Sequence, residues 1–205
     1  FVNFLALLGW SPSDDKEILS LEEMAAEFDL HKVHKAGARF SKEKAEWFNH
    51  QYLQKQSNEE LLESFKNLEE TKNINLSDEK LLKIIGLMKE RATFVKDIYT
   101  QGKFFFEAPA EYDEKAVKKA WNEETASIMT ELSEKLNTTE FKSEILKEEI
   151  HHLVEEKGLG FGKVMMPLRL ALVGELKGPD VPDLLEILGK EESLTRLKLA
   201  IEKIK

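Results

Sequence analysis

The sequence predicts an all-α protein, and three observations carry this prediction. Apolar residues recur every three or four positions along most of the 205 residues, as they do on the buried faces of amphipathic helices. Polar residues that cap helices precede several of these segments, and glycine or proline follows many of them. The alternating apolar and polar pattern of a β-strand is not found, nor is a sequence repeat of fixed period.

Residues 1–40 predict short elements joined by irregular chain. The continuous apolar run of residues 1–8 is expected to be the tail of a buried helix that Gly9 ends. Ser20 and Glu23 have the spacing of a capping box and predict the start of a second helix. Residues 30–39 lack helical periodicity, so an extended connection is expected there.

Two further helices are predicted before a polar segment at residues 67–77. Ser41 is expected to cap the first of them, which carries Trp47, Phe48 and Tyr52. Ser57 and Glu60 form a second capping box. The polar segment is the most plausible joint between two domains.

The second half of the chain predicts longer helices. One helix is expected from Ser77 to Gly102, with an apolar stripe at a period of 3.6 residues. A second is expected from about Asp113 to Asn137, and a third from Thr138 or Thr139 to about residue 158. The final helix has a stripe at Leu194, Leu197, Ile201 and Ile204.

Residues 160–191 predict three short helices joined by rigid turns. Pro167 is expected in the first turn of a helix, where its missing N–H costs nothing. Gly174 and Gly189 are expected to end helices, since glycine adopts the left-handed C-cap conformation without penalty. Pro179 and Pro182 are expected at the start of the helix that Gly189 ends.

Composition limits the classes of function. The net charge is −9, which disfavours indiscriminate binding to nucleic acid. The charge is uneven, because residues 113–157 carry 12 acids and 7 bases whereas residues 158–205 carry 7 acids and 8 bases. Any RNA contact is therefore expected on selected faces.

The chain has no cysteine, which excludes disulfides and thiolate metal sites and is typical of a reducing compartment. No run approaches the roughly 20 apolar residues that span a bilayer. The apolar start lacks the charged region of a signal peptide, and we expect the sequence to be a piece of a longer protein.

Few residues suggest chemistry. His31 with His34, and His151 with His152, lack the further ligands of a metal site, so surface or packing roles are favoured. The glycine-rich residues 158–163 follow a helix and lack the G-K-[ST] ending of a phosphate loop, so a turn between helices is favoured. No catalytic residue is expected.

Arg169 is the one permanent cation of an apolar segment, and the residues alone leave two roles open. Most helix arginines form salt bridges with neighbouring helices, and that role is the commoner one. The alternative is contact with an anionic, planar ligand such as an RNA loop, because the segment is locally basic and a rigid Gly/Pro turn follows it.

Three stretches resemble bacterial glutamyl-tRNA synthetases, in the order in which that family has them. Residues 3–12 read N-F-L-A-L-L-G-W-S-P, and residues 44–52 fit the pattern K-x-x-W-x-N-x-x-Y. Residues 162–174, G-K-V-M-M-P-L-R-L-A-L-V-G, and residues 178–191, G-P-D-V-P-D-L-L-E-I-L-G-K-E, resemble the family's anticodon-binding region. The resemblance covers nearly the whole chain.

The resemblance implies a helical stem-contact and connecting segment at residues 1–72 and an α-helical anticodon-binding domain, a helical bundle or cage, at residues 73–205. It implies that Arg169, Gly178, Pro179 and Val181 lie against anticodon bases. The glycine lacks the hydroxyl that some family members offer there. Arg91, in a segment similar to the family's, is a further candidate RNA-binding residue.

By the same resemblance, the full-length enzyme attaches glutamate to tRNA(Glu) with ATP and Mg²⁺. The sequence lacks the family's H-x-G-H and K-M-S-K-S signatures, so the chain alone is expected to be inactive and to hold no cofactor or metal. The expected partners are the tRNA anticodon loop and stem and the enzyme's own N-terminal catalytic domain. A cytoplasmic monomer without membrane contact is expected.

Two other classes stay open. One is a helical protein-interaction module without RNA binding, which the acidic surface would suit. The other is a helical appendage of a glutaminyl enzyme, although such enzymes usually bind the anticodon with β-barrels and no strand pattern occurs here.

Overall fold

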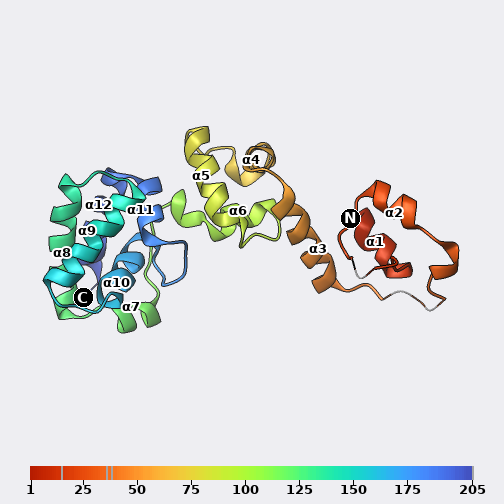
Figure 1. The fold of residues 1–205 in the computed structure, drawn as a ribbon. Coiled ribbons are helices and arrows are strands. Elements are labelled where there is room, and N and C mark those ends of the chain that lie inside the picture. Colours follow the sequence, from red (N-terminus) through yellow and green to blue (C-terminus); the bar gives the residue numbers. More distant parts are fainter. Residues whose placement is uncertain (15, 36, 38, 205) are drawn as a thin grey trace. The chain divides into compact units, whose positions relative to one another are not determined.

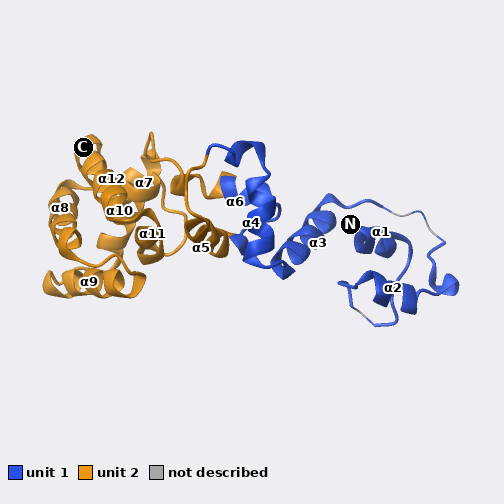
Figure 2. Ribbon diagram, turned by 90° about the horizontal axis from the view of Figure 1, so that it is seen from above, with its two compact units in different colours: residues 1–73, 89–99 blue, residues 74–88, 100–205 orange. Residues whose placement is uncertain are grey.

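The computed structural model describes residues 1–14, 16–35, 37 and 39–204, and the chain forms two compact units. Unit 1 contains residues 1–73 and 89–99, and unit 2 contains residues 74–88 and 100–205 (Figure 2). Both units are helical, and across the described ranges the only strand-like pairing is an isolated bridge between Trp10 and Val33. The all-α prediction is confirmed. None of the described helices is both long and apolar enough to cross a membrane.

Unit 1 consists of helices from the first half of the chain (Figure 1). In chain order they are α1 (Val2–Gly9), α2 (Leu21–Glu27), the 3₁₀ turn η1 (Leu30–Lys32), α3 (Lys42–Lys55), α4 (Asn58–Lys66), the 3₁₀ turn η2 (Glu69–Thr71) and most of α6 (Val95–Gln101). The capping boxes at Ser20 and Ser57 are both present, and the Ser41 hydroxyl accepts the Lys44 N–H. These N-terminal caps were predicted correctly.

Unit 2 holds the larger apolar core. It contains nearly all of α5 (Asp78–Lys89), then the 3₁₀ turn η3 (Lys103–Phe105), α7 (Glu114–Ala120), α8 (Glu123–Thr138), α9 (Ser143–Glu156), α10 (Gly162–Val173), α11 (Val181–Leu188) and α12 (Lys190–Lys203). Helix α12 packs against α8 and α10, and α11 packs against α9. Fully buried side chains such as Leu132, Leu146 and Leu184 fill the space between these helices.

The predicted helix from Ser77 to Gly102 is wrong, because the chain breaks between α5 and α6. Side chains from α3 bind the backbone of the break: Gln54 Nε2 donates to the Lys89 carbonyl, and His50 Nδ1 lies 2.8 Å from the Ala92 carbonyl. The Asp97 carboxylate accepts the N–H groups of residues 93 and 94 and caps α6. Backbone groups that would have continued the helix therefore bond to side chains.

The predicted helix from Asp113 to Asn137 also divides, into α7 and α8. Asn122 Oδ1 accepts the N–H groups of Glu124 and Thr125, and Thr125 Oγ1 accepts the Asn122 N–H in return. This reciprocal cap starts a new helix. The third helix begins at Ser143 rather than at Thr138 or Thr139, whose hydroxyls instead bind the Lys135 carbonyl.

Three smaller expectations are corrected. Pro167 lies in the interior of α10, since that helix begins at Gly162. Helix α1 buries only Asn3 and Phe4, so it is not a buried helix. The connection at residues 30–39 opens with the η1 turn, and its residues 36 and 38 lie outside the described part.

Candidate nucleic-acid interface

Residues 174–181, which join α10 to α11 and include the first residue of α11, form a turn that we call the elbow. It begins where Gly174 ends α10 at φ 87°, as predicted. The Gly174 carbonyl accepts the Asp113 N–H at 2.8 Å, and a Cβ on this glycine would lie 2.9 Å from the Glu111 carbonyl oxygen and from Pro109 Cβ. The positive φ and the close contacts both require glycine, so the start of the elbow is fixed.

Arg169 leaves α10 one turn before its end, and its guanidinium lies against the elbow. Its Nη1 donates to the Pro179 carbonyl. Gly178 has φ 151°, and a Cβ placed on it would lie 3.1 Å from that same Nη1. Gly178 therefore gives the guanidinium room, and the hydrogen bond ties the two ends of the α10–α11 connection together.

The apolar residues of the elbow point into unit 2. Val181 is fully buried and Pro179 is buried, whereas Arg169 is half-buried. Asp180 Oδ1 accepts the Val181 N–H and caps α11. The family resemblance implies that Pro179 and Val181 lie against anticodon bases, but in this structure both residues are buried.

Arg196 is a second arginine of unit 2, and sequence reasoning missed it. Its side chain is 2% exposed, and Nη1 donates to the carbonyls of Phe104 and Leu172 at 2.7 and 2.8 Å, while Nε donates to Glu192 Oε1 at 2.7 Å. A cation beside the last carbonyls of α10 is favourable both as a donor and with respect to the helix dipole. A signal existed, because Arg196 adjoins Leu197 on the apolar stripe of α12 and follows Glu192 by one helical turn.

Arg91 lies in unit 1, exposed on the turn between α5 and α6. The family-like pattern of α3 holds this region together: Asn49 Nδ2 donates to the Thr93 carbonyl, and the Tyr52 hydroxyl lies 2.9 Å from both the Leu19 carbonyl and Asn3 Oδ1. Burial raises the pKa of Tyr52 above its usual value. Asn49 thus binds the turn that carries Arg91, and Tyr52 binds the N-terminal segments of unit 1.

The histidines make separate contacts. His34 Nε2 lies 3.0 Å from Ser11 Oγ, His151 stacks on Phe161 with ring centroids 4.7 Å apart, and His152 Nδ1 lies 3.8 Å from a Glu156 carboxylate oxygen. In the described part of the chain no three groups from histidine, cysteine, aspartate and glutamate gather as a metal site would require. Residues 158–161 belong to the turn between α9 and α10, with Gly158 at φ 58°, and residues 162 and 163 begin α10.

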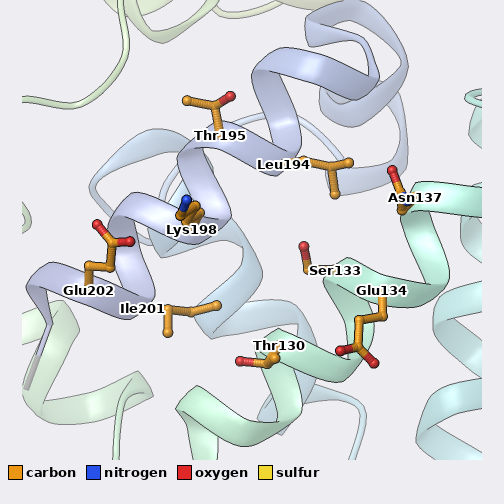
Figure 3. Close-up of a pocket in the computed structure, with 9 residues that line it drawn as sticks. All are labelled: Thr130, Ser133, Glu134, Asn137, Leu194, Thr195, Lys198, Ile201 and Glu202. Atoms are coloured by element: carbon orange, nitrogen blue, oxygen red, sulfur yellow. The ribbon is translucent and has the colours of Figure 1, made fainter.

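A groove of about 500 Å³ runs between α8 and α12 (Figure 3). Its walls carry Leu194 and Ile201 from α12, together with hydroxyl side chains from both helices. Lys198 is its one cation, and Glu134 and Glu202 line it too. Because the lining has a net negative charge, this groove is a poor site for RNA.

The fold is that of a recognised class of domain. The family described as "Anticodon binding domain" matches residues 43–201, and the chain belongs to that family. Among curated relatives, glutamate–tRNA ligases of Flavobacterium johnsoniae and Porphyromonas gingivalis are 49% and 45% identical over 201 and 202 residues, each match covering 98% of this chain and 40% of the relative.

Solved structures agree. A glutamate–tRNA ligase from Elizabethkingia meningosepticum, crystallised in complex with its amino acid, has a TM-score of 0.97 and 67% identity; the match covers 100% of this chain and 41% of that one. The enzyme from Elizabethkingia anophelis gives a TM-score of 0.93 and 66% identity. This chain therefore spans about 40% of the length of the relatives that it matches.

Proposed function

We propose that this chain binds the anticodon loop and stem of tRNA(Glu), and that the protein to which it belongs is a glutamate–tRNA ligase. Support comes from the match to the anticodon-binding family and from relatives at 44–49% identity that carry this enzyme's name. The observation on which the site depends is the Arg169 guanidinium held against the elbow by the Pro179 carbonyl.

The chemistry suits an unstacked nucleotide. A guanidinium is a planar, permanent cation that can donate two parallel hydrogen bonds to a base edge or a phosphate. The hydrogen bond to Pro179 restricts the rotamers of Arg169 before RNA binds. Less side-chain conformational entropy is therefore lost on binding. Gly178 leaves backbone without a side chain beside the guanidinium, so a base can approach closely.

Arg91 is proposed as a second RNA contact, made by unit 1. It is exposed, on a turn fixed by Asn49 and by the Asp97 cap, so it can meet RNA without rearrangement of its backbone. Residues 1–72 are proposed to contact the tRNA stem and to join the catalytic part of the enzyme, and residues 73–205 to read the anticodon.

The whole enzyme is proposed to be a cytoplasmic monomer that activates glutamate with ATP and Mg²⁺ in residues that this sequence does not include. The contribution of this chain is positioning. Correct anticodon contacts hold the acceptor end of the tRNA at the catalytic site, so binding energy gained here appears as rate there.

The test replaces Arg169 in the complete enzyme. Arg169→Ala should lower kcat/KM for tRNA(Glu) by roughly ten- to a hundredfold, because a charge-assisted contact contributes about 1.5–3 kcal/mol. Arg169→Lys should recover only part of the loss, since an ammonium cannot donate in a planar, bidentate way. Glutamate activation should not change. Lys198→Ala, which removes a cation from α12, is the matched control.

Aminoacylation of tRNA(Glu) with mutated anticodon bases decides the role. If Arg169 reads the anticodon, the Ala variant should discriminate less between wild-type and mutated tRNA at an unchanged melting temperature. Full discrimination by an Ala variant that melts earlier would mean that Arg169 only holds the elbow. A chain that binds no tRNA at low salt would favour the helical protein-interaction module.

A further inference from the structure

A small pocket in unit 2 lies apart from the elbow residues. Helices α7 and α8 both pack against α10, and a cavity of about 190 Å³ opens where they meet. Its lining comes from the end of α7, the start of α8 and the first turns of α10: Lys118, Lys119, Ala120, Trp121, Asn122, Glu124, Thr125, Ile128, Gly162, Lys163 and Met166. We call this cavity the lysine pocket.

The lysine pocket is positive in a chain that is strongly negative. Three exposed lysines, Lys118, Lys119 and Lys163, are among its lining residues, and Glu124 is the one acidic residue among them. Elsewhere in unit 2, lysines such as Lys135 have glutamate partners at about 3 Å. Within the described ranges the three pocket lysines make no ion pair, so their ammonium groups are not held by a carboxylate of the protein.

Lys163 is also placed against the usual electrostatic preference of a helix. It lies in the first turn of α10, where the helix dipole is positive, and that turn contains no acidic residue. The N–H groups of Lys163 and Val164 already donate to the carbonyls of Gly160 and Phe161. These two N–H groups are therefore occupied, and the lysine side chains are the candidate groups for binding an anion.

The remaining walls are apolar and aromatic. The half-buried Trp121 lines the cavity together with Ile128 and Met166. Ammonium groups beside an indole ring match a nucleotide, whose phosphate is anionic and whose base or ribose offers a face for packing. A bare inorganic anion would use the lysines and leave the apolar wall empty.

We propose that the lysine pocket binds a phosphodiester group of the RNA backbone next to the anticodon. This proposal rests on the proposed function, because it concerns the same RNA. Lys163 and Arg169 lie on one helix, about 9 Å apart along its axis and about 120° apart around it. An RNA strand that passes around this side of α10 would meet both, with Arg169 reading a base and the pocket neutralising a phosphate without regard to sequence.

The experiment compares two double variants of the chain that remove the same charge from unit 2. Lys118→Gln/Lys163→Gln changes the pocket, and Lys198→Gln/Lys203→Gln changes exposed lysines of α12. Affinities for tRNA(Glu) and for an anticodon-mutated tRNA are measured between 50 and 200 mM salt. In parallel, inorganic phosphate is titrated while the indole N–H signal of Trp121 is followed by NMR, with assignment by Trp121→Phe.

The pocket variant should lose roughly tenfold in affinity at the lower salt, by the same factor for both tRNAs. Its plot of log K against log salt concentration should flatten by about 0.7 to 1 relative to the control. Inorganic phosphate should shift the Trp121 signal in the wild-type chain and not in the pocket variant.

Equal losses in the pocket and control variants would overturn the proposal, since they would reflect general charge. A Trp121 shift with phosphate but a control-like RNA affinity would also overturn it, because the pocket would then be an anion site that RNA does not use. A wild-type chain that binds neither tRNA would instead contradict the proposed function itself.

Discussion

The two units of the chain differ in how they are held together. In unit 2, large side chains on facing helices are fully buried, among them Leu132, Leu146, Leu184 and Leu197. In unit 1, the described residues include ten large apolar side chains that stay exposed: Phe1, Val2, Leu5, Leu21, Phe28, Leu30, Val33, Phe40, Trp47 and Phe94.

Unit 1 also has hydrogen bonds between its segments, which add to the apolar contacts that it makes. Side chains of α3 donate to backbone carbonyls of the turn after α5, and the Tyr52 hydroxyl reaches the Leu19 carbonyl. Such bonds each contribute modestly, so we expect unit 1 to open locally at a lower free energy than unit 2. Unit 1 also buries apolar side chains, among them Leu61, Phe65 and Ile98. The candidate base reader Arg169 belongs to the unit with the larger core, and Arg91 to the unit in which polar bonds add to a smaller one.

The largest difference should come from truncating a core leucine in unit 2. Leu132→Ala is expected to lower the free energy of unfolding by about 2–5 kcal/mol, because Leu132 is fully buried and leaves a cavity. Leu30→Ala, at a position 77% exposed in unit 1, should change it by less than about 0.5 kcal/mol. Urea denaturation measures both, and similar losses would contradict the difference in burial between these two positions.

The next largest effect concerns Arg196. Arg196→Met keeps much of the volume but leaves the carbonyls of Leu172 and Phe104 without their donor, at an expected cost of about 2–4 kcal/mol. Arg196→Lys should be intermediate. Thermal melting of the three proteins tests this, and a Met variant as stable as the wild type would show that apolar packing suffices there.

A smaller, local effect is expected in unit 1. Asn49→Ala removes the bond to the Thr93 carbonyl, and we expect a loss of about 1 kcal/mol. Amide hydrogen exchange should quicken at residues 89–94 and stay unchanged in α8 and α12. Uniform quickening throughout the chain would mean that the two units unfold as one.

The smallest effect depends on pH. Glu186 accepts the Ser143 N–H and lies 2.9 Å from Lys83 Nζ, and these contacts, the first above all, lower the pKa of its carboxyl. A pKa that is lower in the folded state contributes stability above the unfolded value and loses it as pH falls through the folded value. Glu186→Gln should therefore be destabilised near pH 7, by about 0.5–1 kcal/mol, and resemble the wild type in strong acid.

The control for this last change is Glu79→Gln, which alters an exposed carboxylate 3.8 Å from the same lysine. It should leave the pH dependence of unfolding almost unchanged. A Glu186→Gln protein whose stability parallels that of the wild type from pH 3 to pH 7 would show that the carboxylate charge is not used.

The sequence predicted those features that depend on neighbours within one helical turn. The caps at Ser20, Ser41 and Ser57 and the C-cap glycines Gly174 and Gly189 are of this kind. The break between α5 and α6 escaped prediction because the side chains that bind its backbone come from α3, about forty residues earlier. The cap at Asn122 is local and could have been found from its N-x-x-T spacing.

The features of the candidate site fall into the same two groups, those set by local sequence and those set by packing between helices. Glycine and proline spacing predicted the elbow, and the apolar surroundings singled out Arg169. The sequence could not show that the partner of Arg169 is a backbone carbonyl ten residues later, or that Val181 turns inward, because both depend on how α11 packs. The role of the elbow residues in reading RNA stays a prediction.

The close approach of Gly178 to Arg169 has a consequence for how this sequence can vary. A side chain at position 178 would start 3.1 Å from the guanidinium, on a backbone with φ 151° that favours glycine. Alanine at position 178 should therefore be harmful beside arginine and better tolerated beside a shorter residue at position 169. The two substitutions should be non-additive by about 0.5–3 kcal/mol in a double-mutant cycle. Positions 169 and 178 would then evolve together, and the order of the substitutions would decide which intermediates are viable.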